Sequence, residues 1–209
     1  MNTQGRVRLC LLATAVTVAL LPALVAADTP AAAKVAAPQA VAKRDGQHDF
    51  DWMVGTWKAD LKRLVKPLTG STTWVEFEGS QITKSVWSGR GVMDEFTVNS
   101  PATNTRIDGF TLRLYNPESH QWTIYWANAK KGPLDWPPMT GQFTNGRGEF
   151  YDQEVFEGRL IFVRYVWSDI KPDSAHFEQS FSEDGGKTWE PNWISNIYRV
   201  NGAEALTKR

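Results

Sequence analysis

Residues 147–168 read RGEFYDQEVFEGRLIFVRYVWS, and this stretch decides the fold class. Apolar and aromatic residues alternate on both sides of Glu157-Gly158, which predicts one β-strand over 147–157 and a second over 158–168. So short a connection joins antiparallel neighbours, because parallel strands need a crossover of about a dozen residues or more. The stretch therefore predicts an antiparallel β-hairpin.

The same alternation continues from His48 to Val200. No segment of about ten residues or more has a helical period, which excludes a fold of alternating strands and helices. About ten consecutive antiparallel strands would leave two open edges, and closing the sheet removes both. We therefore predict an all-β fold, an antiparallel up-and-down β-barrel of about ten strands, with a two-sheet β-sandwich as the alternative. The further strands are expected at 55–66, 71–79, 80–88, 91–99, 106–115, 120–127, 141–145, 174–183 and 190–200.

The N-terminal residues have the pattern of an export signal. Arg6 and Arg8 precede a long apolar run that ends in the small residues Val25-Ala26-Ala27. This pattern predicts a signal peptide over 1–27, and a retained membrane anchor is the alternative. The mature protein is then periplasmic or secreted, without stable membrane insertion.

Three further segments complete the domain organisation. Residues 28–47 are rich in Ala and contain two prolines, which is typical of a flexible spacer. Residues 48–200 are expected to form the single barrel domain, and 201–209 a C-terminal tail. Because Cys10 would leave with the signal, the barrel has no disulfide and depends on its core for stability.

The charge and the histidines narrow the possible partners. The chain has 23 Lys and Arg against 23 Asp and Glu, and this balance argues against nucleic-acid binding. His48, His120 and His176 are dispersed and lack the spacing of metal ligands, so we expect neither a metal nor another cofactor. Apolar residues on both faces of 120–127 and 158–168 suggest that the outer face is covered by the spacer, by the loop at 128–140 or by a homo-oligomer contact. A small molecule is the expected partner.

The stretch 50–57, FDWMVGTW, resembles the opening signature of lipocalins and related calycins. In that group the Trp of a Gly-x-Trp motif closes one end of the barrel and stacks on an Arg of the last strand. The resemblance implies that Gly55, Trp57 and Arg199 form such a closure here, with a structural role. A guanidinium is suited to this because it stacks on an indole while its edge bonds backbone carbonyls.

The domain as a whole resembles a group of exported bacterial proteins of unknown function with lipocalin-like barrels. The resemblance spans about 48–200 and is carried by HDFDWMVGTW, WVEFEG, DGFTLRLYNPESHQWTIYWAN and the closing YR. It implies the fold and export, and it brings no established activity. A second resemblance, limited to residues 54–57, is to the haem-binding nitrobindin barrels, which need an axial His late in the chain, and no His follows His176.

Residues 182–189, SEDGGKTW, resemble the Asp-box hairpin of sialidase propellers. In such a turn the Ser and Asp side chains bond the turn's own amides while the glycines adopt positive φ. A sialidase would need several copies and a longer chain, so the motif predicts a structural hairpin clamp.

The loop at 128–140 is the longest connection between expected strands, and we predict a lid over the barrel mouth, with a packed plug as the alternative. The candidate function is binding of a small aromatic or amphipathic ligand in the barrel. The alternatives are a barrel enzyme that uses carboxylates such as Glu76, Glu95 or Glu178 with an Arg, and a structural module with a filled barrel. The candidate ligand-binding residues are Trp74, Glu76, Glu95, Arg113, Trp126, Trp136, Arg164 and Glu178.

Overall fold

The structure of the protein is a computed structural model that describes residues 44–200. The expected signal peptide, most of the spacer and the C-terminal tail lie outside the described residues, so those expectations stay predictions. Within 44–200, no helix is long and apolar enough to cross a membrane.

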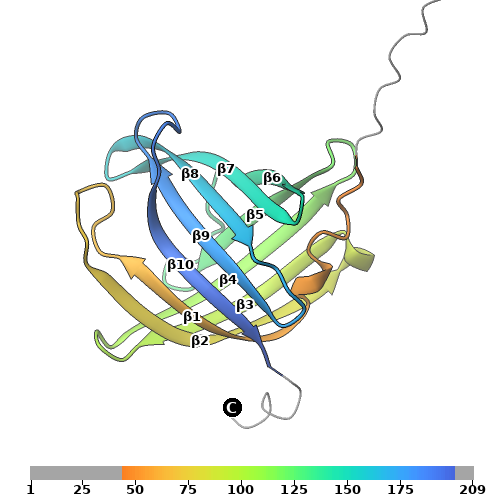
Figure 1. The fold of residues 1–209 in the computed structure, drawn as a ribbon, viewed down its shortest axis with the longest axis horizontal. Coiled ribbons are helices and arrows are strands. Elements are labelled where there is room, and N and C mark those ends of the chain that lie inside the picture. Colours follow the sequence, from red (N-terminus) through yellow and green to blue (C-terminus); the bar gives the residue numbers. More distant parts are fainter. Residues whose placement is uncertain (1–43, 201–209) are drawn as a thin grey trace, which may run out of the picture. The chain divides into compact units, whose positions relative to one another are not determined.

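The described residues form a closed antiparallel barrel in which each strand pairs with the next and β1 pairs with β10 (Figure 1). This arrangement confirms the predicted barrel and excludes the two-sheet sandwich. The strands are β1 (Gly55–Leu64), β2 (Trp74–Val86), β3 (Gly91–Ser100), β4 (Thr105–Asn116), β5 (Gln121–Asn128), β6 (Met139–Thr144), β7 (Arg147–Phe156), β8 (Arg159–Ser168), β9 (Ser174–Ser182) and β10 (Glu190–Arg199).

One strand boundary expected from the sequence is wrong. The sequence around Gly79 predicts a turn between strands at 71–79 and 80–88, but β2 runs unbroken through it. A Cβ atom at Gly79 would lie 1.9 Å from the carbonyl oxygen of Thr97 on β3. The glycine therefore permits a close approach of two strand backbones and does not mark a turn.

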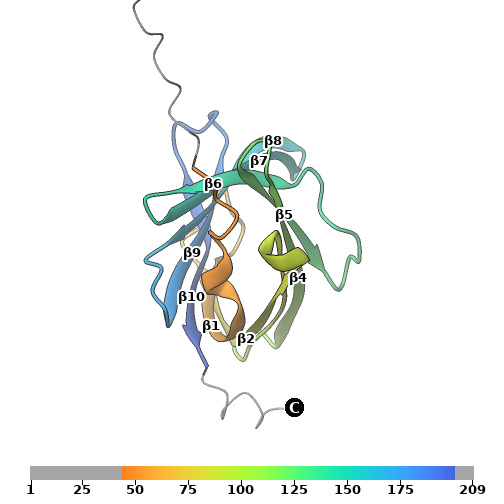
Figure 2. The same ribbon diagram turned by 90° about the vertical axis from the view of Figure 1, so that its right-hand side faces the viewer.

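The barrel has two ends, which we call the floor and the mouth. At the floor, the short 3₁₀ helix η1 (Asp51–Met53) precedes β1, and η2 (Trp87–Gly89) joins β2 to β3. Figure 2 looks toward this end and shows η1 inside the ring of strands. The mouth is the opposite end, and it carries the connections 65–73, 101–104, 129–138, 157–158 and 183–189.

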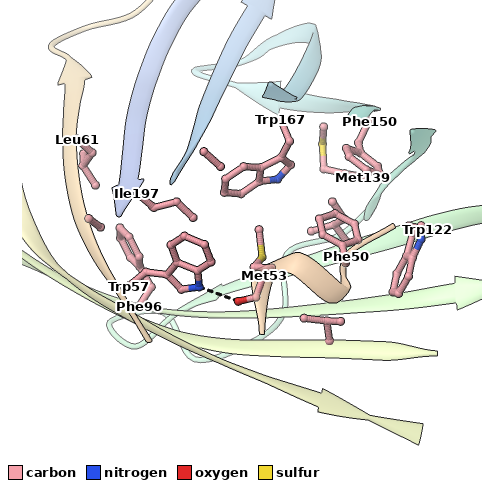
Figure 3. Close-up of a cluster of buried hydrophobic side chains, with 14 of the residues drawn as sticks. Phe50, Met53, Trp57, Leu61, Phe96, Trp122, Met139, Phe150, Trp167 and Ile197 are labelled. Atoms are coloured by element: carbon pink, nitrogen blue, oxygen red, sulfur yellow. Dashed lines mark hydrogen bonds between the residues drawn. The ribbon is translucent and has the colours of Figure 1, made fainter. Parts of the chain in front are cut away.

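The floor half of the interior is filled with the protein's own side chains (Figure 3). Phe50 and Met53, which come from the segment before β1, are fully buried together with Trp57 and Phe150. The Phe50 ring meets Trp122 edge-on, with 5.0 Å between the ring centroids. Because this half is packed, a ligand would have to enter the barrel through the mouth.

The floor is closed by the Trp57 indole and the Arg199 guanidinium, whose carbon lies 4.1 Å from the ring centroid. This distance is within the range of about 6 Å for a cation–π contact. Arg199 also donates to the backbone carbonyls of Pro172, Val54 and Trp52 at 2.6–2.9 Å. A Cβ at Gly55 would lie 2.5 Å from a guanidinium nitrogen, so a glycine is needed beside the stack.

The 182–189 hairpin at the mouth holds the bonds expected of its motif. The Asp184 carboxylate accepts hydrogen bonds from the amides of Lys187 and Thr188 and from the Thr188 hydroxyl. These bonds lower the pKa of Asp184 to about 2. Ser182 donates to the same carboxylate and accepts from the Gly186 amide. The hairpin is therefore a self-bonded turn with a structural role.

Candidate functional site

Between the packed floor and the mouth, polar side chains of three strands face the interior. Asp152 and Glu154 alternate along β7 with outward residues, and they pair across to Val163 and Ile161, both buried in the core. Tyr165 of β8 and Asn192 and Ser195 of β10 complete this set. We call the five residues Asp152, Glu154, Tyr165, Asn192 and Ser195 the polar wall.

The polar wall contains buried atoms without a hydrogen-bond partner in the described residues. These atoms are Asp152 Oδ1, Asn192 Nδ2 and Ser195 Oγ. Asn192 and Ser195 are each only 4% exposed. The Asn192 oxygen accepts from Gln179 Nε2 at 2.7 Å, which holds its amide group in the interior. Each unpaired buried polar group costs about 1–3 kcal/mol, so a molecule that bonds these atoms would recover that free energy.

Among the described residues, neither acid of the polar wall forms an ion pair. Burial, followed by repulsion from Glu154 and Asp135, raises the pKa of Asp152 to about 7. Burial and Asp135 also raise the pKa of Glu154, while Lys131 opposes the shift. Burial raises the pKa of Tyr165 well above its usual range, and the nearby acids add to the effect. Acids with raised pKa values in a concave interior are typical of functional sites.

Three aromatic rings adjoin the polar wall, and we call them the aromatic cluster. Phe96, Trp126 and Trp193 come from three strands, with ring centroids separated by 6.1–6.2 Å. Trp126 lies flat over Gly109, where a Cβ would clash with its ring at 1.9 Å. Such rings offer a large apolar surface to a ligand while neighbouring polar groups fix its orientation.

Arg63, near the end of β1, lies at the mouth against the aromatic cluster. The guanidinium carbon lies 4.8 Å from the centroid of the Trp193 ring. Among the described residues, no carboxylate forms an ion pair with Arg63, and no acceptor bonds its guanidinium. The side chain is exposed, yet the neighbouring walls displace part of its hydration, and this desolvation lowers its pKa. The residue lines a hollow of about 230 Å³ with Leu64, Val65, Val75, Phe77, Thr103 and Thr105.

Two residues from the sequence list face the interior. Trp126 belongs to the aromatic cluster, and Arg113 lies deeper, over the Phe50 ring at 5.2 Å. Arg113 is paired with Asp94, and both side chains are at most 5% exposed. Thr111 donates a further hydrogen bond to Asp94. Because Asp94 neutralises its charge, Arg113 is not a free cation for a ligand, although its Nε has no hydrogen-bond partner in the described residues.

The remaining strand residues of the sequence list lie on the outer face, so their expected place in the interior is wrong. On β2, Val75 and Phe77 point inward, which turns Trp74 and Glu76 outward. Lys62 lies over the Trp74 ring at 5.0 Å, and Glu76 is exposed. Phe96 likewise turns Glu95 outward. The sequence list took these residues from the set that faces solvent. Alternation alone does not identify the inner set, because a shift of one residue exchanges the two faces of a strand.

Arg164 and Glu178 are also on the outer face. Arg164 lies 4.6 Å from the centroid of the Trp189 ring, and its guanidinium approaches Glu178 at 3.6 Å. The inward positions on those strands belong to Tyr165 and Phe177, whose rings lie 5.2 Å apart. The outer pair is therefore part of a surface contact between β8, β9 and the Asp-box hairpin.

The 128–140 loop lies at the mouth, next to the polar wall. Its backbone is anchored by a bridge between Ala127 and Leu134 and by a 2.7 Å hydrogen bond from the Asp135 amide to Trp126. The charge of Asp135 on this loop contributes to the raised pKa values of Asp152 and Glu154. Trp136 is 79% exposed, so its ring does not lie in the barrel.

The sequence list omits all five residues of the polar wall, and it also omits Phe96, Trp193 and Arg63. The alternation of β7 places Phe150, Asp152, Glu154 and Phe156 on one face, and this pattern was a usable signal for the two acids. Arg63 follows Lys62 in the sequence, and nothing in the pattern distinguishes the inward cation from the outward one. No group of three His, Cys, Asp or Glu able to hold a metal occurs in residues 44–200.

Solved structures share this fold. The S-type phycobiliprotein lyase CPES from Guillardia theta is similar with a TM-score of 0.54 at 13% identity, covering 76% of this chain and 94% of that one. Rv2717c from M. tuberculosis has a TM-score of 0.51 at 11% identity, covering 76% and 99%. No family model and no curated protein matches the chain. At these identities the likeness shows the lipocalin-like barrel fold and nothing of activity.

Proposed function

We propose that the protein binds a small amphipathic aromatic molecule in the mouth half of its barrel, and that it does so after export with removal of residues 1–27. The observation that carries the proposal is the set of unpaired interior atoms on Asp152, Asn192 and Ser195 beside the aromatic cluster. A barrel that served only as a structural module would gain stability from apolar residues at these positions, because unpaired buried polar groups are costly.

The site divides the recognition of a ligand between two surfaces. Phe96, Trp126 and Trp193 supply apolar contact, from which most of the affinity of such sites comes. The polar wall supplies hydrogen-bonding groups of both kinds, since Asn192 Nδ2 donates and Asp152 Oδ1 accepts when the carboxyl is ionised. A flat ring system with a hydrogen-bonding group fits this combination.

Titration with N-phenyl-1-naphthylamine tests the proposal. This uncharged probe fluoresces strongly in apolar surroundings, and we expect saturable binding to the folded barrel. Trp126→Leu should weaken binding about tenfold, since a lost aromatic contact costs about 1–2 kcal/mol. Trp87→Leu is the matched control, because Trp87 is 67% exposed at the floor. Absence of saturable binding, or equal loss in both variants, would overturn the proposal.

A further inference from the structure

We propose that the ligand carries an anionic group, a carboxylate or its equivalent, that binds Arg63 in the mouth hollow. This inference rests on the proposed function and adds the charge of the ligand and the place where that charge lies. The hollow is a distinct part of the mouth, lined by β1, β2 and the β3–β4 connection.

The first argument is that the Arg63 guanidinium is held in place yet lacks a partner. The guanidinium carbon lies over the Trp193 ring, 4.8 Å from its centroid, and this cation–π contact positions the side chain. Apart from Arg90 at the floor, the other guanidinium groups of the described residues have carboxylate or carbonyl partners, such as Arg113 with Asp94 and Arg199 with three carbonyls. A flat guanidinium whose edge is free can bond both oxygens of a carboxylate.

The second argument concerns the surroundings of Arg63. The hollow of about 230 Å³ is lined mainly by apolar side chains, including Val75 and Phe77. Apolar walls beside the cation strengthen its attraction for an anion, and because Arg63 is still exposed, an anion can reach it from solvent. The Thr103 and Thr105 side chains line the same hollow, and their hydroxyls can donate to an anion as well as accept.

The third argument is the distribution of charge around the barrel. Arg63 lies on β1, whereas the unpaired acids Asp152 and Glu154 lie on β7, four strands away around the ring. An anionic group is repelled by the acids and attracted by Arg63, so it binds at the β1 side. The aromatic body then lies on Trp193, and a donor group of the ligand faces Asp152. The site therefore selects an aromatic anion with a hydrogen-bond donor at its other end.

The experiment compares 2-naphthoate with 2-naphthamide, which have nearly the same shape and differ in charge. Both are titrated against barrel loaded with N-phenyl-1-naphthylamine, and displacement of the probe is measured. We expect 2-naphthoate to bind at least tenfold more tightly than the amide. Arg63→Gln should remove most of this preference by weakening the binding of 2-naphthoate far more than that of the amide, since a charge-assisted pair is worth roughly ten- to hundredfold.

Arg90→Gln is the matched control, because Arg90 is a second guanidinium without a carboxylate partner and lies in a separate hollow by Trp87 and Tyr115, near the floor. It should keep the preference for 2-naphthoate. The inference is overturned, while the proposed function stands, if the probe binds and the wild-type protein does not prefer 2-naphthoate to 2-naphthamide. The same conclusion follows if Arg63→Gln retains that preference. If the probe does not bind at all, both fail.

Discussion

Replacing Asp152 by Asn should stabilise the barrel, and the gain should grow as the pH rises. The Asp152 carboxyl is half-buried in the polar wall, has an oxygen without a partner, and faces a second acid on the same strand. An Asn side chain has the same shape as the protonated acid and carries no charge at any pH. The substitution therefore removes the cost of ionisation and keeps the packing.

The magnitude follows from the pKa of Asp152, which burial and the neighbouring Glu154 and Asp135 raise from 3.8 to about 7. A tenfold change in proton affinity corresponds to about 1.4 kcal/mol, which sets a ceiling of about 4 kcal/mol. Because the carboxyl remains partly accessible to solvent, screening reduces this to about 2 kcal/mol. A domain of this size would gain roughly 4–8 °C in Tm.

The sign of the pH dependence is set by which state holds the proton more tightly. The folded state does, since its pKa is raised, so ionisation of Asp152 makes the wild-type barrel less stable between about pH 4 and pH 7. Below this window both states are protonated, and the substitution should change little. Above it the full gain of about 2 kcal/mol should appear.

Urea unfolding followed by Trp fluorescence at pH 4 and pH 8 measures the two values. Asp108→Asn is the matched control, because Asp108 is paired with Arg106 on the outer face and its pKa is lowered. The control should lose stability above about pH 4, opposite in sign to Asp152→Asn. A gain for Asp152→Asn that is equal at pH 4 and pH 8, or a loss at pH 8, would refute the reasoning.

Two further predictions concern the floor and the export signal. Arg199→Lys should lower the unfolding free energy by about 2–3 kcal/mol, because a lysine cannot replace the bonds to Pro172, Val54 and Trp52. An unchanged urea midpoint would show that this closure does not stabilise the barrel. Protein recovered from the periplasm of a bacterial host should lack residues 1–27 by intact mass, and a mass that retains them would contradict export.

The features that the sequence predicts well are those that depend on local pattern. Short turns such as Glu157-Gly158 fix antiparallel pairing, and the barrel follows because ten such strands have no other cover for their edges. The closure by Trp57 and Arg199 is what the resemblance to the lipocalin opening signature implies, and the two side chains do stack in the structure. Gly79 shows the limit of local pattern. A glycine is needed there because the backbone of Thr97 on β3 lies too close for a side chain, and no local pattern reveals that contact.

The site was harder to predict because it depends on which face of each strand points inward. Alternation divides the residues of a strand into two sets without naming the inner one. On β2 and β3 the charged set is outside, so Glu76 and Glu95 face solvent. A consistent rule of charge outside would then have placed Arg113 outside as well, yet it is buried with Asp94.

Strand β7 departs from that rule most clearly, because two of its acids face the interior at the candidate site. Its outer face carries Tyr151, 41% exposed, and Val155, 72% exposed, while Asp152 and Glu154 face the interior. Phe150 is fully buried in the core and fixes the orientation of the strand, which carries the two acids inward with it. Exchanging these acids for apolar residues would remove both their mutual repulsion and the cost of ionising them in a buried place, so the barrel would become more stable. Keeping two acids without ion pairs inside the barrel costs stability, and the proposed binding of a ligand to the polar wall gives a physical reason for that cost.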